Sequence, residues 1–385
     1  MVEKKLKVIQ MLPALEAGGV ERGTLEMAAY LVRQGHESLV ISAGGRLREQ
    51  LVDEGTTHYC WDIGAKRLGV LLWIRKVRRL LERQKPDIIH LRSRLPAWIA
   101  YLAWRKMDPA VRPGLVTTVH GPYTPGWYSA VMARGERVIA ISEMIHQYVL
   151  RHYPFVDPQR LSVIYRGVDR AQYPFAYQPP REWSARWQQQ FPQLAGKYVL
   201  TLPARITRWK GHEHFVRLIG LLKQQGIPAY GLIVGEPHKR KRHFLHALQQ
   251  QIGTAGLAED FCFTGHRTDL KNILAVSDVV LSLALEPEAF GRTTIEALSL
   301  GVPVAGYAHG GVAEQLQQVL PEGAVPVGDL AAMAGLLVQW YRQRPAIKRE
   351  HGFTLHNMLS QTLSVYTGLV SEKAGSSKTG SRGKR

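Results

Sequence analysis

Apolar and polar positions follow two different rhythms along the first half of the chain. Short apolar runs bounded by turn residues are typical of buried strands, whereas apolar residues spaced three and four positions apart are typical of amphipathic helices. The predicted strands cover residues 7–12, 38–42, 87–91, 115–119, 137–141 and 161–165. The predicted helices between them cover residues 20–34, 71–84, 96–106 and 143–152.

The alternation stops near residues 170–193, where tyrosine, proline, tryptophan and glutamine dominate, and we interpret this stretch as a linker. It then resumes, with strands predicted at 198–203, 229–234, 261–264, 278–283, 303–307 and 324–327. The helices of this half are predicted at 212–225, 242–252, 270–275, 293–299, 312–319, 330–340 and 354–370. Because strands and helices alternate, each half is expected to hold a parallel sheet covered by helices on both faces.

The pattern therefore predicts two doubly wound α/β domains that face each other across a cleft. We place the first at residues 1–175, the linker at 176–193 and the second at 194–353. A length of 385 residues suffices for two domains of ordinary size. A hydrophobic content of 45% with 21% charged residues is typical of a soluble globular protein.

Composition argues against a membrane-spanning or disulfide-linked protein. No apolar stretch approaches the roughly 20 residues that a membrane-spanning helix needs, and the first residues lack the pattern of a signal peptide. The two cysteines, Cys60 and Cys262, lie far apart and without metal-ligand spacing. This favours a reducing cytoplasm over a disulfide framework or a zinc site.

The formal net charge of +19 has two sources. Residues 373–385 are polar and basic, and we expect a disordered tail there. A denser source is the region 66–106, in which the predicted helix 71–84 is basic and amphipathic. Such a helix can lie on an anionic bilayer, although a solvated helix face is the alternative. Nucleic acid is disfavoured as a partner because no reading motif or aromatic platform accompanies the charge. The candidate acceptor or membrane residues are Arg75, Arg78, Arg79, Arg92 and Arg94.

Two carboxylates bracket a tight turn and a helix start in the second half. Glu288 precedes the turn Phe290-Gly291-Arg292, and Glu296 lies about one turn inside the helix that Thr293 or Thr294 can cap. The positive end of such a helix binds anions, most often phosphate. The motif follows an apolar strand, where ligands of parallel α/β sheets bind. The alternative is that the helix dipole alone favours these glutamates.

Other strand ends carry residues that suit a phosphorylated sugar ligand. Gly18 and Gly19 follow the first strand and let a phosphate approach a helix start, or form a plain turn. They lack the G-x-G-x-x-G spacing of a dinucleotide site. His120 ends another strand, where it donates a hydrogen bond to a sugar hydroxyl or is satisfied within its loop.

A basic loop and two glycine turns complete the candidates in the second half. Arg205 and Lys210 can bind a diphosphate and stabilise its charge as it departs, or they form a solvated basic loop. The turns at Gly235 and at His266-Arg267 can line a nucleobase slot.

Together these segments resemble the family-four retaining glycosyltransferases. The motifs are the Gly18-Gly19 loop, Thr118-Val-His120-Gly, Ala204-Arg205…Lys210-Gly211, Val234-Gly235, Phe263-Thr264-Gly265-His266 and Glu288-x7-Glu296, of which the last is the most specific. The segment 92–98 with His120-Gly121 is also similar to bacterial enzymes that extend the lipopolysaccharide core. The resemblance implies the GT-B fold, with two Rossmann-like domains and a final helix, here 354–372, that crosses back to the N-terminal domain.

The resemblance also implies residue roles. Glu288 would contact the donor sugar hydroxyls, Glu296 the ribose, Arg205 and Lys210 the diphosphate, and His120 the region of the reacting carbon. The implied catalytic set is His120, Arg205, Lys210 and Glu288. The implied donor-binding set is Gly18, Gly19, Gly235, His266, Arg267, Phe290, Gly291, Arg292, Thr293 and Glu296. The family needs no metal ion or other cofactor, in keeping with the lack of an Asp-x-Asp motif.

The function expected from the resemblance is retaining transfer of a hexose from a UDP- or GDP-sugar. The acceptor would be lipid-linked or a lipopolysaccharide core, and the enzyme would be cytoplasmic and peripheral on the inner membrane. Two alternatives stay open: a nucleotide-sugar epimerase or hydrolase on the same fold, and a non-catalytic protein that binds anionic surfaces. A phosphorylase is disfavoured because no pyridoxal-lysine context is visible.

Overall fold

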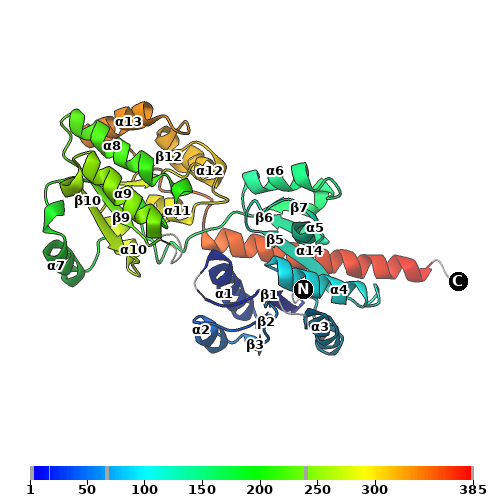
Figure 1. The fold of residues 1–385 in the computed structure, drawn as a ribbon. Coiled ribbons are helices and arrows are strands. Elements are labelled where there is room, and N and C mark those ends of the chain that lie inside the picture. The colour runs from blue at the N-terminus through cyan, green and yellow to red at the C-terminus, as the bar shows by residue number, and fades with distance from the viewer. Residues whose placement is uncertain (1–3, 17, 66–68, 238–241, 383–385) are drawn as a thin grey trace. The chain divides into compact units, whose positions relative to one another are not determined.

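The chain forms two compact units in a computed structural model, which describes residues 4–16, 18–65, 69–237 and 242–382 (Figure 1). Unit 1 comprises Met1–Tyr165 and Asn357–Arg385, and unit 2 comprises Arg166–His356. The change from unit 1 to unit 2 thus comes ten residues before the boundary expected at residue 175. Within the described residues, no helix is both long and apolar enough to span a bilayer.

Strands and helices alternate in both units. The strands are β1 Lys7–Met11, β2 Glu37–Ser42, β3 Thr57–Cys60, β4 Ile88–Leu91, β5 Gly114–Val119, β6 Arg137–Ala140, β7 Leu161–Val163, β8 Tyr198–Pro203, β9 Ala229–Val234, β10 Phe261–Gly265, β11 Val279–Ser282, β12 Val304–Tyr307 and β13 Ala324–Val325. The α-helices are α1 Gly19–Arg33, α2 Arg48–Asp53, α3 Val70–Gln84, α4 Arg94–Arg105, α5 Trp127–Ala130, α6 Glu143–His152, α7 Arg181–Gln190, α8 His212–Gln224, α9 Arg242–Thr254, α10 Leu270–Ala275, α11 Arg292–Ser299, α12 Gly310–Val319, α13 Leu330–Arg342 and α14 Leu355–Arg382.

Each unit is a doubly wound parallel sheet. In the described part of unit 1, seven strands follow the order β3-β2-β1-β4-β5-β6-β7. In the described part of unit 2, six strands follow the order β10-β9-β8-β11-β12-β13. All strand pairs are parallel, so the prediction of two parallel α/β units is confirmed. The strand order reverses between β1 and β4 and between β8 and β11, and ligands of such sheets bind at the carboxyl ends of the strands at this reversal.

An aspartate joins the central strand pair of each sheet at the edge where the strands begin. The Lys7 N–H donates to Asp87 Oδ2 at 2.8 Å in unit 1, and the Val199 N–H donates to Asp278 Oδ2 at 2.7 Å in unit 2. Burial raises the pKa of Asp278, against the opposing effects of the Val199 hydrogen bond and the Arg344 charge. In both sheets, therefore, an aspartate side chain that accepts a backbone N–H fixes the register of the two strands at the reversal point.

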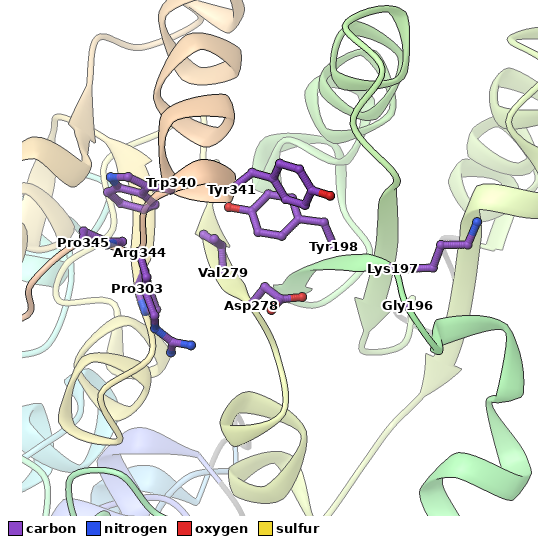
Figure 2. A pocket seen from close by; sticks show the side chains of 10 residues that line it. All are labelled: Gly196, Lys197, Tyr198, Asp278, Val279, Pro303, Trp340, Tyr341, Arg344 and Pro345. Atoms are coloured by element: carbon purple, nitrogen blue, oxygen red, sulfur yellow. The ribbon is translucent and has the colours of Figure 1, made fainter.

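A pocket of about 240 Å³ adjoins Asp278 at this edge of unit 2 (Figure 2). The rings of Tyr198 and Tyr341 lie next to each other there, with centroids 5.1 Å apart. This pocket opens at the start of the strands, at the opposite edge from the loops described below.

The expected linker 176–193 is largely helix α7, which corrects the sequence interpretation. Trp183, Trp187 and Phe191 recur every four residues and are buried against Leu232 and Ile273 of unit 2. The Trp183 and Trp187 rings stack with centroids 5.1 Å apart. An aromatic stripe at helical spacing outweighs the linker-like composition because its burial stabilises the helix.

The last helix, α14, spans Leu355–Arg382 and so extends into the segment 373–385 for which we expect a disordered tail. Tyr366 and Leu369 of this helix are buried in unit 1, and Lys373 Nζ lies 3.0 Å from Glu136 Oε2. Once packing has nucleated a helix, each further residue adds a hydrogen bond without a new nucleation cost. Residues 383–385 of the expected tail lie outside the described part of the chain.

Candidate active site

The loop after β8 is held against the loop after β11. Gly211 ends the turn Arg208–Lys210 with φ of +75°, and a Cβ there would lie 1.9 Å from the Leu283 carbonyl oxygen. Only glycine allows this approach. The Leu285 N–H also donates to the Trp209 carbonyl at 2.7 Å. The two loops at the strand reversal of unit 2 therefore form one surface.

Lys210 and Glu288 meet on this surface. Lys210 Nζ lies 2.7 Å from Glu288 Oε1, with side-chain exposures of 15% and 20%. The ammonium also lies 4.3 Å from the centroid of the Trp209 ring. Arg205 of the same loop is exposed and forms no ion pair with any described residue. The sheet thus brings Lys210, which we expected to bind the diphosphate, into contact with Glu288, which we expected to bind the sugar of the same donor.

Helix α11 begins with Gly291 as its N-cap, at φ of +82°. The helix starts at Arg292, and the Thr294 N–H donates to the Gly291 carbonyl at 3.1 Å. The expectation that Thr293 or Thr294 caps the helix is therefore wrong. Glycine reaches the left-handed conformation without strain, so the helix starts one residue before the threonines.

Glu296 lies inside the first turns of α11 and is almost completely buried. Arg292 Nε lies 3.1 Å from Glu296 Oε1, and the side-chain exposures are 27% and 6%. A buried carboxylate is stable when an opposite charge and hydrogen bonds compensate for its lost hydration. Arg292 thus serves in this structure to hold Glu296.

Two glycines that the sequence reading missed support the Glu288 loop. The Gly311 N–H donates to the Glu288 carbonyl at 2.8 Å, and a Cβ on Gly310 would lie 2.5 Å from the same oxygen. A Cβ on Gly311 would lie 2.5 Å from Phe290 Cα. The signal was present, since Gly310-Gly311 opens a helix just as Gly18-Gly19 does.

The loops after β9 and β10 are joined by a bridge between Gly235 and Gly265. A Cβ on Gly235 would lie 2.2 Å from the Ala204 carbonyl oxygen, so this turn packs on the backbone beside Arg205. His266 is exposed. The three loops expected to bind a nucleotide are therefore contiguous in unit 2.

The Arg267 guanidinium is already engaged. It donates to both carboxylate oxygens of Asp269, at 2.9 and 2.7 Å, and Trp183 Nε1 of α7 donates to Asp269 Oδ2 at 2.7 Å. Burial alone would raise the pKa of Asp269, but these hydrogen bonds outweigh it and hold the pKa below its ordinary value. Arg267 thus fastens the loop to α7.

The candidates of unit 1 lie at the ends of β1 and β5. Gly18 and Gly19 are exposed, and a Cβ on Gly19 would meet no atom within 4 Å. Packing therefore does not demand glycine at position 19. His120 is half-buried, and its backbone N–H donates to Tyr123 Oη at 3.2 Å.

Arg92 is 3% exposed, which corrects its assignment as an acceptor or membrane residue. Its Nε donates to Gln10 Oε1 at 2.7 Å, and Tyr366 of α14 also bonds to it. Burial lowers the pKa of Arg92, while the Tyr366 and Glu26 charges act in the opposite direction. His90 bonds to Tyr366 Oη and to Thr118 Oγ1, each at 2.6 Å. These side chains form a buried polar network between the sheet and α14.

The other basic residues of unit 1 are accessible to different degrees. Arg75 and Arg79 of α3 are exposed, whereas Arg78 Nε lies 2.7 Å from Glu82 Oε1. Arg94 is half-buried, with its guanidinium carbon 4.9 Å from the Tyr123 ring centroid. Only α3 therefore presents free arginines of the set that we assigned to a membrane or acceptor.

No group of three or more histidine, cysteine, aspartate or glutamate side chains in the described part of the chain is arranged to hold a metal ion.

His212 makes unit 2 sensitive to acid. Burial, together with the Lys210 charge, lowers the pKa of His212 to about 4. The folded pKa lies below the unfolded value, so the unfolded state binds the proton more tightly between pH 6.5 and 4. We expect the free energy of unfolding to fall by about 3 kcal/mol across this window on account of His212 alone.

Urea denaturation at several pH values tests this prediction. The His212→Leu variant should lose less stability than the parent between pH 6.5 and 4, because it lacks the titrating ring. His266→Leu, which removes an exposed histidine, is the matched control and should follow the parent. Parallel pH profiles for the parent and His212→Leu would contradict the assignment.

Two family models match the chain. The model described as Glycosyltransferase Family 4 matches residues 17–172, and that described as Glycosyl transferases group 1 matches residues 184–350. The chain is 24% identical over 393 residues to the N-acetyl-alpha-D-glucosaminyl L-malate synthase of Bacillus anthracis, covering 96% of this chain and 94% of that protein. It is 27% identical over 226 residues to the lipopolysaccharide core biosynthesis mannosyltransferase LpsB of Rhizobium meliloti (strain 1021), covering 58% and 60%.

Solved structures share the fold. A glycosyltransferase from Rickettsia africae ESF-5 superimposes with a TM-score of 0.83 at 28% identity, covering 96% of this chain and 99% of that one. Anabaena Alr3699/HepE in complex with UDP-glucose superimposes with a TM-score of 0.70 at 20% identity, covering 97% and 100%. The second likeness concerns the fold alone.

Proposed function

The chain belongs to the family 4 glycosyltransferases, and from this premise we propose that it transfers a hexose from a nucleoside diphosphate sugar with retention of configuration and without a metal ion. The observation that carries the proposal is the Lys210–Glu288 pair, 2.7 Å apart at the strand reversal of unit 2. In this proposal Lys210 is the cation that binds the diphosphate, and Glu288 accepts hydrogen bonds from the sugar hydroxyls.

We also infer from the Lys210–Glu288 pair how the donor binds. The diphosphate takes over the Lys210 ammonium, because two phosphate charges attract it more strongly than one carboxylate. Glu288 is then released to accept hydrogen bonds from the sugar. Arg205, exposed on the same loop, supplies a second cation to the diphosphate.

Transfer follows by cleavage of the bond between the sugar carbon and the phosphate oxygen. The leaving diphosphate keeps the electron pair, and Lys210 and Arg205 stabilise its charge. The acceptor oxygen bonds to the same face of the carbon and gives its proton to the departing phosphate oxygen. Glu296, which forms an ion pair with Arg292, accepts hydrogen bonds from the ribose hydroxyls of the donor.

Binding of the donor tests the proposal directly. A UDP-sugar or a GDP-sugar should raise the melting temperature, since a ligand that binds only the folded state stabilises it by mass action. A panel of UDP-, GDP- and ADP-sugars measured by thermal shift identifies the base. UDP is the first candidate, because the HepE structure holds UDP-glucose. No shift with any nucleotide sugar would contradict the proposal, and consumption of the donor without any acceptor would instead favour hydrolysis or epimerisation.

We propose a lipid-linked or lipopolysaccharide-core acceptor at an anionic membrane surface, which would make the enzyme peripheral on the inner membrane. The relative LpsB supports the acceptor class, and α3 supports the surface. Its buried side includes Ile74, Val77 and Leu80, while Arg75 and Arg79 are exposed. Trp127 of α5, 76% exposed, adds an aromatic side chain of the kind that lies at bilayer interfaces.

Neutralising Arg75, Arg78 and Arg79 to glutamine should weaken binding to anionic vesicles by about 30-fold, since each free arginine contributes about 1 kcal/mol near such a surface and Arg78 is already paired with Glu82. Co-sedimentation with phosphatidylserine-containing vesicles measures the effect. The matched control neutralises Arg181, Arg186 and Arg217, which are exposed on unit 2. Equal loss in both triple variants would mean that total charge, and not α3, governs binding.

A further inference from the structure

Helix α4 of unit 1 begins with a half-buried arginine that has no acidic partner. Arg94 is the first residue of this helix and forms no ion pair with a carboxylate in the part of the chain that the structure describes. Arg78 and Arg137, which are half-buried in the same unit, are each paired with a glutamate. Partial removal of a cation from water costs free energy unless polar partners compensate. Arg94 is therefore a candidate for binding an anion that does not belong to this chain.

Two tyrosine rings and one hydroxyl contact the Arg94 guanidinium. Its carbon lies 4.9 Å from the centroid of the Tyr123 ring and 5.4 Å from that of the Tyr128 ring. Its Nη1 donates to Ser129 Oγ at 3.3 Å. The ring faces attract the cation but accept none of its ordinary hydrogen bonds, so one of its five N–H donors has an acceptor among the described residues. The other donors are available to a phosphate or carboxylate, which a guanidinium binds through two parallel hydrogen bonds.

The two tyrosines are held in place by hydrogen bonds from neighbouring segments. Trp98 Nε1 of α4 donates to the Tyr128 carbonyl at 2.9 Å. The Tyr148 hydroxyl of α6 donates to the Tyr123 carbonyl, and the Tyr123 hydroxyl accepts the backbone N–H of His120 at 3.2 Å. Because the rings that flank the guanidinium are already fixed, an anion that binds there orders few further side chains and pays little conformational entropy.

These side chains belong to the ligand-binding edge of the unit 1 sheet. Arg94 follows the end of β4 by three residues, and Tyr123 follows the end of β5 by four. The two strands are parallel neighbours, and β4 adjoins the strand reversal of this sheet. Ligands of doubly wound sheets bind at this edge. In the proposed function the diphosphate of the donor is bound by Lys210 and Arg205 of unit 2, so the donor does not supply the counter-ion of Arg94.

Trp127 adjoins the same side chains. It is 76% exposed, and its ring centroid lies 5.9 Å from that of Tyr128 and 5.6 Å from that of Trp98. We have proposed that Trp127 lies at the bilayer interface. An anion bound by Arg94 is then close to the membrane surface, where a lipid-linked substrate carries its charged groups and a soluble nucleotide sugar does not. This neighbourhood favours the acceptor as the source of the anion.

We infer that Arg94, flanked by Tyr123 and Tyr128 and bonded to Ser129, is a subsite for a phosphate or carboxylate group of the acceptor. This inference rests on the proposed function. It specifies the acceptor as an anionic glycan or glycolipid, and it makes Arg94 the residue that selects such an acceptor over a neutral one.

Saturation-transfer NMR with the full chain tests the subsite in the presence of saturating UDP, which fills the donor site. Glucose 6-phosphate and glucuronate are the anionic probes, and methyl glucoside is the neutral one. We expect at least one anionic probe to bind about tenfold or more tightly than methyl glucoside, because hydrogen bonds between charged groups contribute enough free energy for such a factor. The comparison of the two anionic probes shows which oxyanion the subsite prefers.

Arg94→Met should weaken binding of that probe by about tenfold or more. Arg94→Lys keeps the charge but loses the planar fork, so it should restore part of the affinity. Arg112→Met is the matched control. Arg112 is also half-buried in unit 1, with its guanidinium carbon 3.6 Å from the Trp104 ring centroid, but it lies on the loop that precedes β5. This variant should bind the probe as the parent does, and all three variants should still bind UDP.

Nucleotide binding, measured on the same samples, separates the two levels of the proposal. If UDP binds but neither anionic probe does, or if Arg94→Met and Arg112→Met bind the probe equally, the subsite is overturned while the proposed function stands. If UDP displaces the probe, Arg94 binds the donor, and if phosphatidylserine vesicles displace it, Arg94 binds the head groups of the membrane. Either result overturns the acceptor subsite. If neither UDP nor GDP binds to the parent, the proposed function itself fails.

Discussion

Lys210→Met is expected to lower kcat/KM for sugar transfer by about 10²- to 10³-fold, the loss typical of removing one group that stabilises developing charge. The substitution keeps the length of the side chain and removes only the cation. The departing diphosphate then lacks the Lys210 ammonium, which the structure holds beside Glu288. Most of the loss should appear in kcat, because the charge on the leaving oxygen develops in the transition state.

Lys223→Met is the matched control for this variant. Lys223 Nζ lies 2.7 Å from Asp260 Oδ1, the same separation as in the Lys210–Glu288 pair, but this pair joins α8 to the turn that precedes β10. Its loss should leave transfer within twofold of the parent. A Lys210→Met enzyme as active as Lys223→Met would remove Lys210 from the mechanism.

A double-mutant cycle with Glu288→Gln shows whether the pair works as a unit. Lys210 and Glu288 are in direct contact, and contacting residues give non-additive effects. We expect the double variant to lose less activity than the product of the two single losses. Strict additivity would mean that the two side chains act on separate parts of the donor without influencing each other.

Arg92→Met is expected to lower the free energy of unfolding of unit 1 by about 2–4 kcal/mol, because it leaves two buried neutral acceptors without their donor. The guanidinium is 3% exposed and donates to Gln10 at 2.7 Å. Methionine fills similar space but leaves the oxygens of Gln10 and Tyr366 without this donor. The network joins β1, β4 and β5 to α14, so the loss should spread through the unit 1 sheet.

Hydrogen exchange of amides in β1 and β4, combined with urea denaturation, measures this loss for unit 1 separately from unit 2. Arg105→Met is the control, because Arg105 lies on the neighbouring helix α4 and is exposed. It should change stability by less than about 0.5 kcal/mol. Vesicle binding should be unaffected by Arg92→Met as long as the protein is folded, which is the opposite of what the sequence-based assignment of Arg92 implies.

The sequence allowed most of the fold to be predicted, because local periodicity depends on neighbouring residues only. The strand ends at Met11, Val119 and Pro203 were located to within a residue. Short elements without a marked period were missed, including β3 and α2. Helix α7 was missed for another reason. Its tryptophans were counted as part of a linker-like composition, although Trp183 and Trp187 are four residues apart, as on one face of a helix.

Arg92 illustrates why charge in a sequence does not indicate exposure. It follows the apolar strand β4, two residues after His90, and so shares a face of the sheet with it. Two polar side chains on one face of a strand between apolar runs were the available signal for a buried network. Whether α14 would cover that face and supply Tyr366 is a long-range event that no local pattern records.

By itself, the sequence determined the two α/β units, the strand-end positions of Lys210, Glu288 and Glu296, and the glycines that allow tight turns beside them. Only the tertiary structure decided that Lys210 contacts Glu288, that Arg267 is fastened to α7 and that Arg92 is buried. The physical reason is strand order. A strand's own residues specify that it forms, whereas its neighbours are chosen by packing of the whole sheet, and it is the placement of β8 beside β11 that joins the two halves of the candidate donor site.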